Sequence, residues 1–193
     1  MLEKIKKYNI ILGSNSPRRK KILEEIGLKF KVIPSYINES IDQEENVENI
    51  PIYLAKKKSQ ALNNILKTND LLITADTIVL FKEKILAKPK NEEDARKILL
   101  EISSNTHKVI TGVCISIKNK AHSFSCTTEV NFNKIEESEI DYYIKKYKPF
   151  DKAGSYGIQE WIGLIGIKKI NGSYSNVVGL PASRLYQELK RLI

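Results

Sequence analysis

Cysteine, histidine and arginine are scarce in this chain of 193 residues. It has two cysteines, two histidines, and five arginines against 27 lysines. Cys114 and Cys126 lack the close spacing of a metal or redox motif, and we expect them to be buried, reduced thiols. The two histidines are too isolated to form a zinc site with them. These shortages argue against a disulfide-stabilised secreted fold and against a structural zinc centre.

Long apolar runs are also missing. No segment approaches the ~20 residues that span a bilayer, and residues 1–7 lack the apolar core of a signal peptide. We therefore expect a cytoplasmic protein without membrane contact. The formal net charge of +9 favours polyanionic ligands such as nucleotides. Because the lysines are spread along the chain and form no stripe, the charge does not predict a stable complex with nucleic acid.

The composition is that of a globular protein. Hydrophobic residues make up 41% of the chain and charged residues 28%, which is ordinary for a soluble fold. No linker, repeat or low-complexity tract interrupts the sequence, so we predict a single domain over residues 1–193. Apolar strand-like runs alternate with helical segments, and two neighbouring runs have the character of a hairpin. This mixture predicts an α/β fold with a mixed sheet.

The apolar pattern predicts the elements individually. Strands are expected at 9–12, 30–33, 71–74, 78–81, 109–117, 123–132 and 161–170, and helices at 17–26, 51–67, 92–102, 136–146 and 181–192. Ser16 can cap the first of these helices, with Pro17 as its first residue and Gly27 beyond its end. Asn91 followed by three acidic residues predicts another well-capped helix start.

The first strand, turn and helix predict an anion site. Backbone N–H groups and the positive end of the helix dipole face an anion at such a helix start. Arg18 and Arg19 in the first turn add bidentate donors for phosphate oxygens. Since cations disfavour a helix N-terminus, their presence there suggests that an anion binds. Two solvated basic residues remain the plain alternative.

Two charged residues interrupt apolar segments. Asp76 is the single charge in residues 71–81, and a carboxylate there is costly unless it is paired, hydrogen-bonded or bound to metal. It is a candidate general base or magnesium ligand, or else an Asp held by local backbone donors. Lys58 falls within the apolar stripe of a helix, so its side chain either snorkels to solvent or points into a cleft.

Three further segments complete the candidate site. Lys88 follows a strand end, and Glu39 lies in an acidic loop; alone, each is typical of a surface residue. The loop at 151–159 has two glycines and both signs of charge, which is more typical of a ligand loop than of a simple reversal. Cations that hold a triphosphate, with carboxylates that hold Mg²⁺ and orient water, are the groups used for in-line displacement at phosphorus. The sequence has no GxxxxGK[ST] loop, so it is not a P-loop enzyme.

At this point the sequence resembles the Maf family of nucleoside triphosphate pyrophosphatases over nearly its whole length. The residues that carry the resemblance are 14–19, Ala55 with Lys58, 75–77, 88–89, His107 with 111–113, 151–159, and 171–174 with 178–181. The resemblance implies hydrolysis of a nucleoside triphosphate to the monophosphate and pyrophosphate with Mg²⁺ or Mn²⁺. It also implies a homodimer and an elongated mixed sheet, with two lobes around a cleft, similar to the inosine-triphosphate pyrophosphatases.

The resemblance assigns roles to individual residues. Asp76 is expected to be the general base and a metal ligand, with Glu39 in a supporting metal or water role. Phosphate binding is expected at Ser14, Arg19, Lys58 and Lys88.

Three positions bear on the substrate. Arg18, Thr77 and Gln159 match the branch that acts on dTTP and UTP, whereas the branch that acts on 7-methyl-GTP carries an aromatic residue, Gln and Glu there. The Gln159 amide offers a donor and an acceptor to a pyrimidine edge, and Gly154 and Gly157 are expected to let the backbone close around the nucleotide.

The alternatives are a 7-methyl-GTP or purine triphosphate pyrophosphatase, or a non-catalytic regulator of septum formation. The sequence departs from the family pattern at Gly13, Asn38 and Ser59. Asn38 thins the carboxylate cluster around Glu39 and leaves the metal affinity in question.

Overall fold

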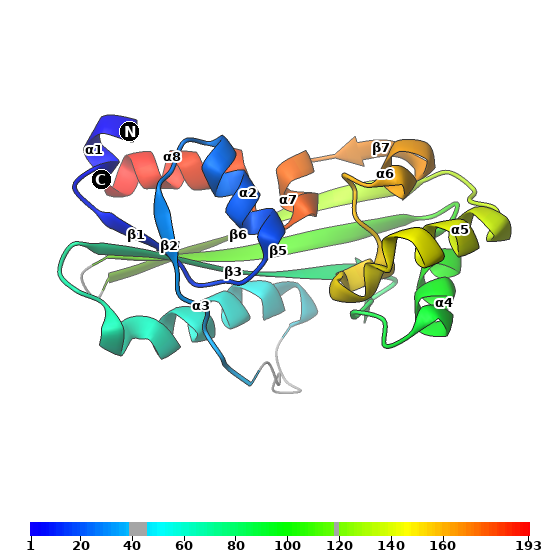
Figure 1. Ribbon diagram of the computed structural model, residues 1–193, viewed down its shortest axis with the longest axis horizontal. Coiled ribbons are helices and arrows are strands. Elements are labelled where there is room, and N and C mark those ends of the chain that lie inside the picture. The colour runs from blue at the N-terminus through cyan, green and yellow to red at the C-terminus, as the bar shows by residue number, and fades with distance from the viewer. Residues whose placement is uncertain (39–45, 118–119) are drawn as a thin grey trace. The chain divides into compact units, whose positions relative to one another are not determined.

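A seven-stranded sheet organises the chain (Figure 1). The structure, a computed structural model, describes residues 1–38, 46–117 and 120–193. Within these residues the strand order is β2-β1-β3-β5-β6-β7, and β4 pairs with β3. The predicted α/β fold with a mixed sheet and flanking helices is confirmed. The chain divides into two compact units: Met1–Asp76 with Thr111–Cys126 and Gly179–Ile193, and Thr77–Ile110 with Thr127–Val178.

The first unit contains the parallel part of the sheet. Its strands are β1 (Asn9–Leu12), β2 (Phe30–Val32) and portions of β3 (Asp70–Phe81), β5 (Thr106–Ile117) and β6 (Lys120–Phe132). Its helices are α1 (Leu2–Ile5), α2 (Pro17–Glu25), α3 (Ile50–Leu62) and α8 (Ala182–Leu192). β1 pairs in parallel with both β2 and β3, and Leu12 lies opposite Ile73. Figure 1 shows α2 and α8 on one face of these strands and α3 on the other.

The second unit contains antiparallel pairs and its own core. It adds β4 (Lys84–Ile85), β7 (Ile167–Asn171), α4 (Glu92–Ile102), α5 (Glu137–Tyr147), α6 (Trp161–Gly166) and α7 (Tyr174–Val178). β4 pairs with β3 and β7 pairs with β6, both antiparallel. Arg96 on α4 binds Glu137 and Asp141 on α5, at 2.6 and 3.2 Å. Buried aliphatic and aromatic side chains from α4, α5, β3 and β6 form one cluster.

The helix caps predicted at Ser16, Gly27 and Asn91 are confirmed. The Ser16 hydroxyl accepts the Arg19 backbone N–H at 3.4 Å, and Pro17 is the first residue of α2. Gly27 follows α2 with a φ of 80°, a left-handed conformation that glycine adopts without strain. The Asn91 side chain accepts the Asp94 N–H at 2.8 Å at the start of α4.

The predicted strand at 161–170 is wrong in its first half. Residues 161–166 form α6, and only then does β7 begin at Ile167. A short apolar run does not distinguish a strand from a buried helical turn by its period. Gly163 allows the tight helical turn, because a Cβ there would lie 1.9 Å from the carbonyl oxygen of Ile158. Ile162 is fully buried, whereas Leu164, on the opposite side of the helix, is 79% exposed.

Other element boundaries differ less. The runs predicted at 71–74 and 78–81 are parts of the single strand β3, which continues through Asp76. α3 ends at Leu62, where a helix to residue 67 was expected, and α7 was not predicted. No helix in the described ranges is long and apolar enough to cross a membrane. The single domain over residues 1–193 stays a prediction.

Candidate active site

The start of α2 holds Arg19 in a fixed position. Its Nη1 donates to the Ser14 hydroxyl at 3.1 Å, and its Nε donates to the Gly179 carbonyl oxygen at 2.9 Å. The Ser14 hydroxyl also accepts the Ser16 backbone N–H at 3.2 Å. Arg19 is 9% exposed, so the side chain loses little further conformational freedom on binding an anion. The structure therefore brings together Ser14 and Arg19, which the sequence assigned to phosphate binding.

Gly179 has a role that the sequence did not predict. Its segment, Val178 to Pro181, was part of the family resemblance, but no function was attached to it. Gly179 has a φ of 122°, in the region that favours glycine, and its carbonyl fixes the guanidinium of a residue 160 positions away. In the sequence, the Gly179-Leu180-Pro181 motif marks this segment as unusual, but no neighbouring residue indicates that its partner is Arg19.

Lys58 and Asp76 form an ion pair. The Lys58 Nζ lies 2.5 Å from Asp76 Oδ1, and the two side chains are 10% and 13% exposed. The lysine on the apolar stripe of α3 therefore points inward to the carboxylate and does not snorkel to solvent. This ion pair offsets the desolvation free energy of placing a carboxylate in an apolar strand. It also leaves a base candidate and a phosphate-binding candidate in direct contact.

Strand pairing brings the start of α2 and Asp76 to the same end of the parallel strands. Gly13 continues the β1–β3 pairing, because its N–H donates to the Ile73 carbonyl at 2.8 Å. Ser14 follows Gly13, and Asp76 follows Ile73 by three residues. Ligands of open α/β sheets bind beyond the carboxyl ends of parallel strands. The first unit thus presents phosphate donors and a carboxylate at the end of the sheet where such ligands bind.

The remaining predicted residues are placed as follows. Arg18 is half-buried on α2 in the first unit. Thr77, Lys88 and Gln159 belong to the second unit; Thr77 is half-buried on β3, while Lys88 and Gln159 are exposed. Glu39 lies outside the described residues. Among residues 1–38, 46–117 and 120–193, no group of three or more His, Cys, Asp or Glu side chains is arranged to hold a metal.

The glycines of the loop at 151–159 are required by the packing of the protein itself. Gly154 has a φ of 72°, and a Cβ there would meet the side chain of Val79 at 3.0 Å. A Cβ at Gly157 would lie 2.7 Å from the Glu160 carboxyl carbon. Packing within the protein is therefore enough to explain both glycines. Their predicted role in closing the backbone around the nucleotide stays a prediction.

His107 anchors the loop at 151–159 through Tyr156. Its Nε2 is 2.8 Å from the hydroxyl of Tyr156, and its ring contacts those of Tyr156 and Phe132. Burial lowers the pKa of His107 to about 4, so the imidazole is neutral near neutral pH. His107 was named by the resemblance without a role, and its contacts are structural.

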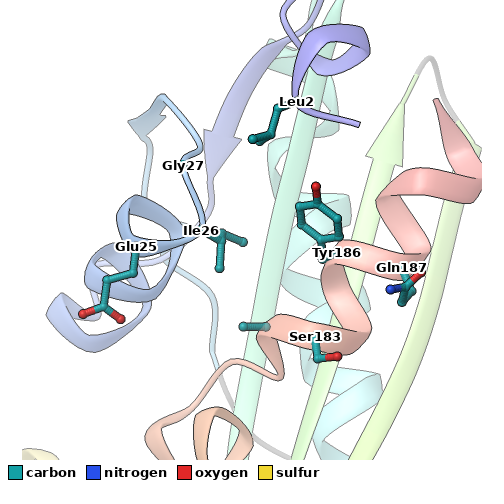
Figure 2. A pocket seen from close by; sticks show the side chains of 8 residues that line it. Leu2, Glu25, Ile26, Gly27, Ser183, Tyr186 and Gln187 are labelled. Carbon is teal, nitrogen blue, oxygen red and sulfur yellow. The ribbon is translucent and has the colours of Figure 1, made fainter.

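A separate surface hollow is apolar and contains no predicted site residue. It has a volume of about 500 Å³ and is lined by Leu2, Glu25, Ile26, Gly27, Ala182, Ser183, Tyr186 and Gln187. Figure 2 shows Leu2, Ile26 and Tyr186 pointing toward one another, with the Glu25 carboxylate turned away. Among the described residues that line it there is no lysine or arginine, so this hollow does not suit a triphosphate.

Comparisons with known proteins extend over the full chain. The sequence model of a family described as Maf-like protein matches residues 9–192. A dTTP/UTP pyrophosphatase of Phocaeicola vulgatus is 53% identical over 194 residues, which is 100% of each chain. That of Parabacteroides distasonis is 50% identical over 191 residues, 98% of this chain and 99% of the relative. Among solved structures, the Ham1 protein of Staphylococcus aureus is 16% identical with a TM-score of 0.48, covering 95% of this chain and 98% of that one.

Proposed function

The chain belongs to the Maf-like protein family, and on that premise we propose that it is a nucleoside triphosphate pyrophosphatase that hydrolyses dTTP and UTP. Relatives named dTTP/UTP pyrophosphatase at 53% and 50% identity support this substrate class. The names of these relatives do not favour a 7-methyl-GTP or purine triphosphate pyrophosphatase, or a non-catalytic septum regulator. The observation that carries the chemistry is the Lys58–Asp76 pair at 2.5 Å.

The proposed reaction is attack of water on the α-phosphorus. Asp76 accepts a proton from the attacking water, the bond from the α-phosphorus to the α–β bridging oxygen breaks, and pyrophosphate leaves with that oxygen. Arg19, already oriented by Ser14 and Gly179, binds phosphate oxygens as a bidentate donor. Lys58 and Lys88 add positive charge for the developing negative charge on the leaving group.

The carboxylates suit a hard divalent cation. Mg²⁺ keeps several waters and is usually held by one or two carboxylates together with substrate phosphates. Asp76, which contacts Lys58, is proposed as one such carboxylate, and Glu39 is proposed as the second. When bound, Mg²⁺ or Mn²⁺ would neutralise phosphate charge and polarise the reacting phosphoryl group. Arg19, Lys58 and Lys88 retain their roles in binding and orientation.

The substrate base is proposed to contact residues of the second unit. Gln159 is exposed, and its amide can pair with both a donor and an acceptor of a pyrimidine edge. Thr77 and Arg18 are proposed to contribute to the same preference. We further propose that the enzyme is a cytoplasmic homodimer without stable nucleic-acid or membrane partners.

Replacement of the proposed base tests this function. Asp76→Asn should lower kcat for dTTP by about 10²–10⁴-fold, which is the usual contribution of a general base, when measured as pyrophosphate release with Mg²⁺. Asp70→Asn is the matched control, because Asp70 is a buried carboxylate at the start of the same strand, β3, and accepts hydrogen bonds from Asn9 and Lys67. The control should retain its kcat. Wild-type turnover in Asp76→Asn would remove Asp76 from the role of base.

A further inference from the structure

Gln159 stands at the tip of a short closed turn. The Glu160 N–H donates to the Gly157 carbonyl at 3.0 Å, which makes Ile158 and Gln159 the two central residues of the turn. Ile158 is 4% exposed and packs in the core of the second unit, whereas Gln159 is exposed. The turn is therefore anchored at its base and presents one amide side chain.

A single buried hydroxyl joins both ends of this turn. Tyr143, on α5, is fully buried, and its hydroxyl accepts the Gly157 N–H at 3.0 Å and donates to Oε2 of Glu160. Burial, together with the hydrogen bond to Glu160, raises the pKa of Tyr143. The phenol therefore remains a protonated donor across the working range of pH. Gly157 and Glu160 are the first and last residues of the turn, so Tyr143 fixes the spacing between them.

Lys152 holds the same carboxylate from the other side. Its Nζ lies 3.1 Å from Oε1 of Glu160 and 2.7 Å from Oδ1 of Asp151, and its side chain is 9% exposed. Glu160 immediately precedes α6, where the helix dipole favours a negative charge, and its side chain makes no capping hydrogen bond. Both of its oxygens are bound by Tyr143 and Lys152.

Gly157 lies next to both this carboxylate and the Gln159 amide. A Cβ on Gly157 would lie 2.7 Å from Cδ of Glu160 and 3.0 Å from Nε2 of Gln159. The carboxylate and the amide therefore lie against the same side of one glycine.

From these contacts we infer that Tyr143, Glu160 and Lys152 are positioning residues that orient the Gln159 amide, and that they thereby set the preference for pyrimidine over purine triphosphates. The inference rests on the proposed function, in which Gln159 contacts the base. These three residues are proposed to act without touching the substrate. They act by fixing the turn that carries the residue which does.

The test compares Tyr143→Phe with Tyr142→Phe. Tyr142 is on the same helix, is 43% exposed, and its hydroxyl accepts from Lys146. Tyr143→Phe keeps the ring and removes the hydroxyl, so we expect a KM for dTTP raised about tenfold, as fits the loss of a hydrogen bond to a charged group, with kcat changed less. The kcat/KM ratio of dTTP to dGTP should fall by a similar factor. Tyr142→Phe should leave both unchanged.

A double-mutant cycle separates positioning from a general loss of structure. In a Gln159→Ala background, Tyr143→Phe should cause no further fall in the ratio of dTTP to dGTP, because the residue through which it acts is gone. Glu160→Gln is a milder second variant that removes the charge facing Lys152, and it should lower the same ratio. Thermal unfolding identifies any variant that fails to fold.

The outcomes also separate this inference from the proposed function. If the wild-type protein releases no pyrophosphate from any nucleoside triphosphate, the proposed function fails and this inference fails with it. If the wild type discriminates as expected but folded Tyr143→Phe and Glu160→Gln keep the wild-type ratio, or lose activity equally on all substrates, only the positioning role is overturned. Additive effects in the Gln159→Ala background would overturn it as well.

Discussion

At the scale of single residues, two departures from the family pattern are explained by their neighbours. Gly13 leaves room for Thr74, because a Cβ at position 13 would lie 2.5 Å from the Thr74 methyl carbon. Thr74 in turn donates its hydroxyl to the Ala55 carbonyl at 2.7 Å, which ties β3 to α3. Ser59 is buried, and its hydroxyl is 2.6 Å from that of Ser116. Packing explains Gly13 and a buried hydrogen bond explains Ser59, so neither departure implies a different reaction.

Gly13→Ala should therefore destabilise the protein. We expect a fall of about 1–3 kcal/mol in the free energy of unfolding, as for other overpacked cores, measured by urea denaturation. Gly13→Ala with Thr74→Ser should recover most of the loss, because serine lacks the clashing methyl group but keeps the hydroxyl for Ala55. Thr74→Ser alone serves as the reference. Wild-type stability in Gly13→Ala would show that the strand spacing relaxes without cost.

The sequence also indicated the importance of Asp76 and Lys58 but not their contact. An isolated carboxylate in an apolar strand predicts a partner, yet the partner of Asp76 is 18 positions away on a helix. For Lys58 the residue pattern left two orientations open. The pairing of α3 with β3 is a tertiary event, so neither segment alone contains it.

At the scale of elements, capping chemistry was predictable and loop packing was not. Ser16 and Asn91 are local signals, and both cap helices as expected. The turn that carries Gln159 is held by Tyr143, on a helix that ends four residues before Asp151. The composition of the loop does not indicate that the turn depends on Tyr143. The same loop is anchored by His107, whose neutral, buried imidazole has a consequence for stability.

Stability should fall between pH 6.5 and about 4 partly because of His107. The unfolded histidine binds a proton below its ordinary pKa of about 6.5, whereas burial lowers the pKa of the folded residue to about 4. The contribution to stability is thus fully present above pH 6.5 and is lost as the pH falls through the folded pKa. From pH 7 to 4.5 this amounts to about 2 kcal/mol.

The measurement is the free energy of unfolding of the wild type and of His107→Gln across this range. Carboxylates titrate in both proteins, so only the difference between them reports His107. The wild type should lose its advantage over the variant as the pH falls. A difference that stays constant with pH would show that His107 is not neutral and buried as described.

At the scale of the whole molecule, the fold class was predictable, because strand and helix patterns alternate throughout the chain. The candidate site was predictable mainly through family resemblance. Its residues come from separate segments: Ser14 and Arg19 from the start of α2, Lys58 from α3, and Asp76 from β3. Tertiary structure alone reveals the carbonyl of Gly179 on Arg19 and the Tyr143 network beneath Gln159. Arg19 and Gly179 are 160 positions apart in the sequence. Tyr143 is 17 positions from Glu160 and 14 from Gly157.

The proposed activity is the release of pyrophosphate from pyrimidine nucleoside triphosphates. The most direct measurement incubates the purified protein and Mg²⁺ with dTTP, UTP, dATP, dGTP and 7-methyl-GTP in parallel, and quantifies monophosphate, pyrophosphate and orthophosphate. We expect equal amounts of monophosphate and pyrophosphate, with the highest kcat/KM for dTTP and UTP. Orthophosphate with a nucleoside diphosphate, or a clear preference for a guanine nucleotide, would contradict it.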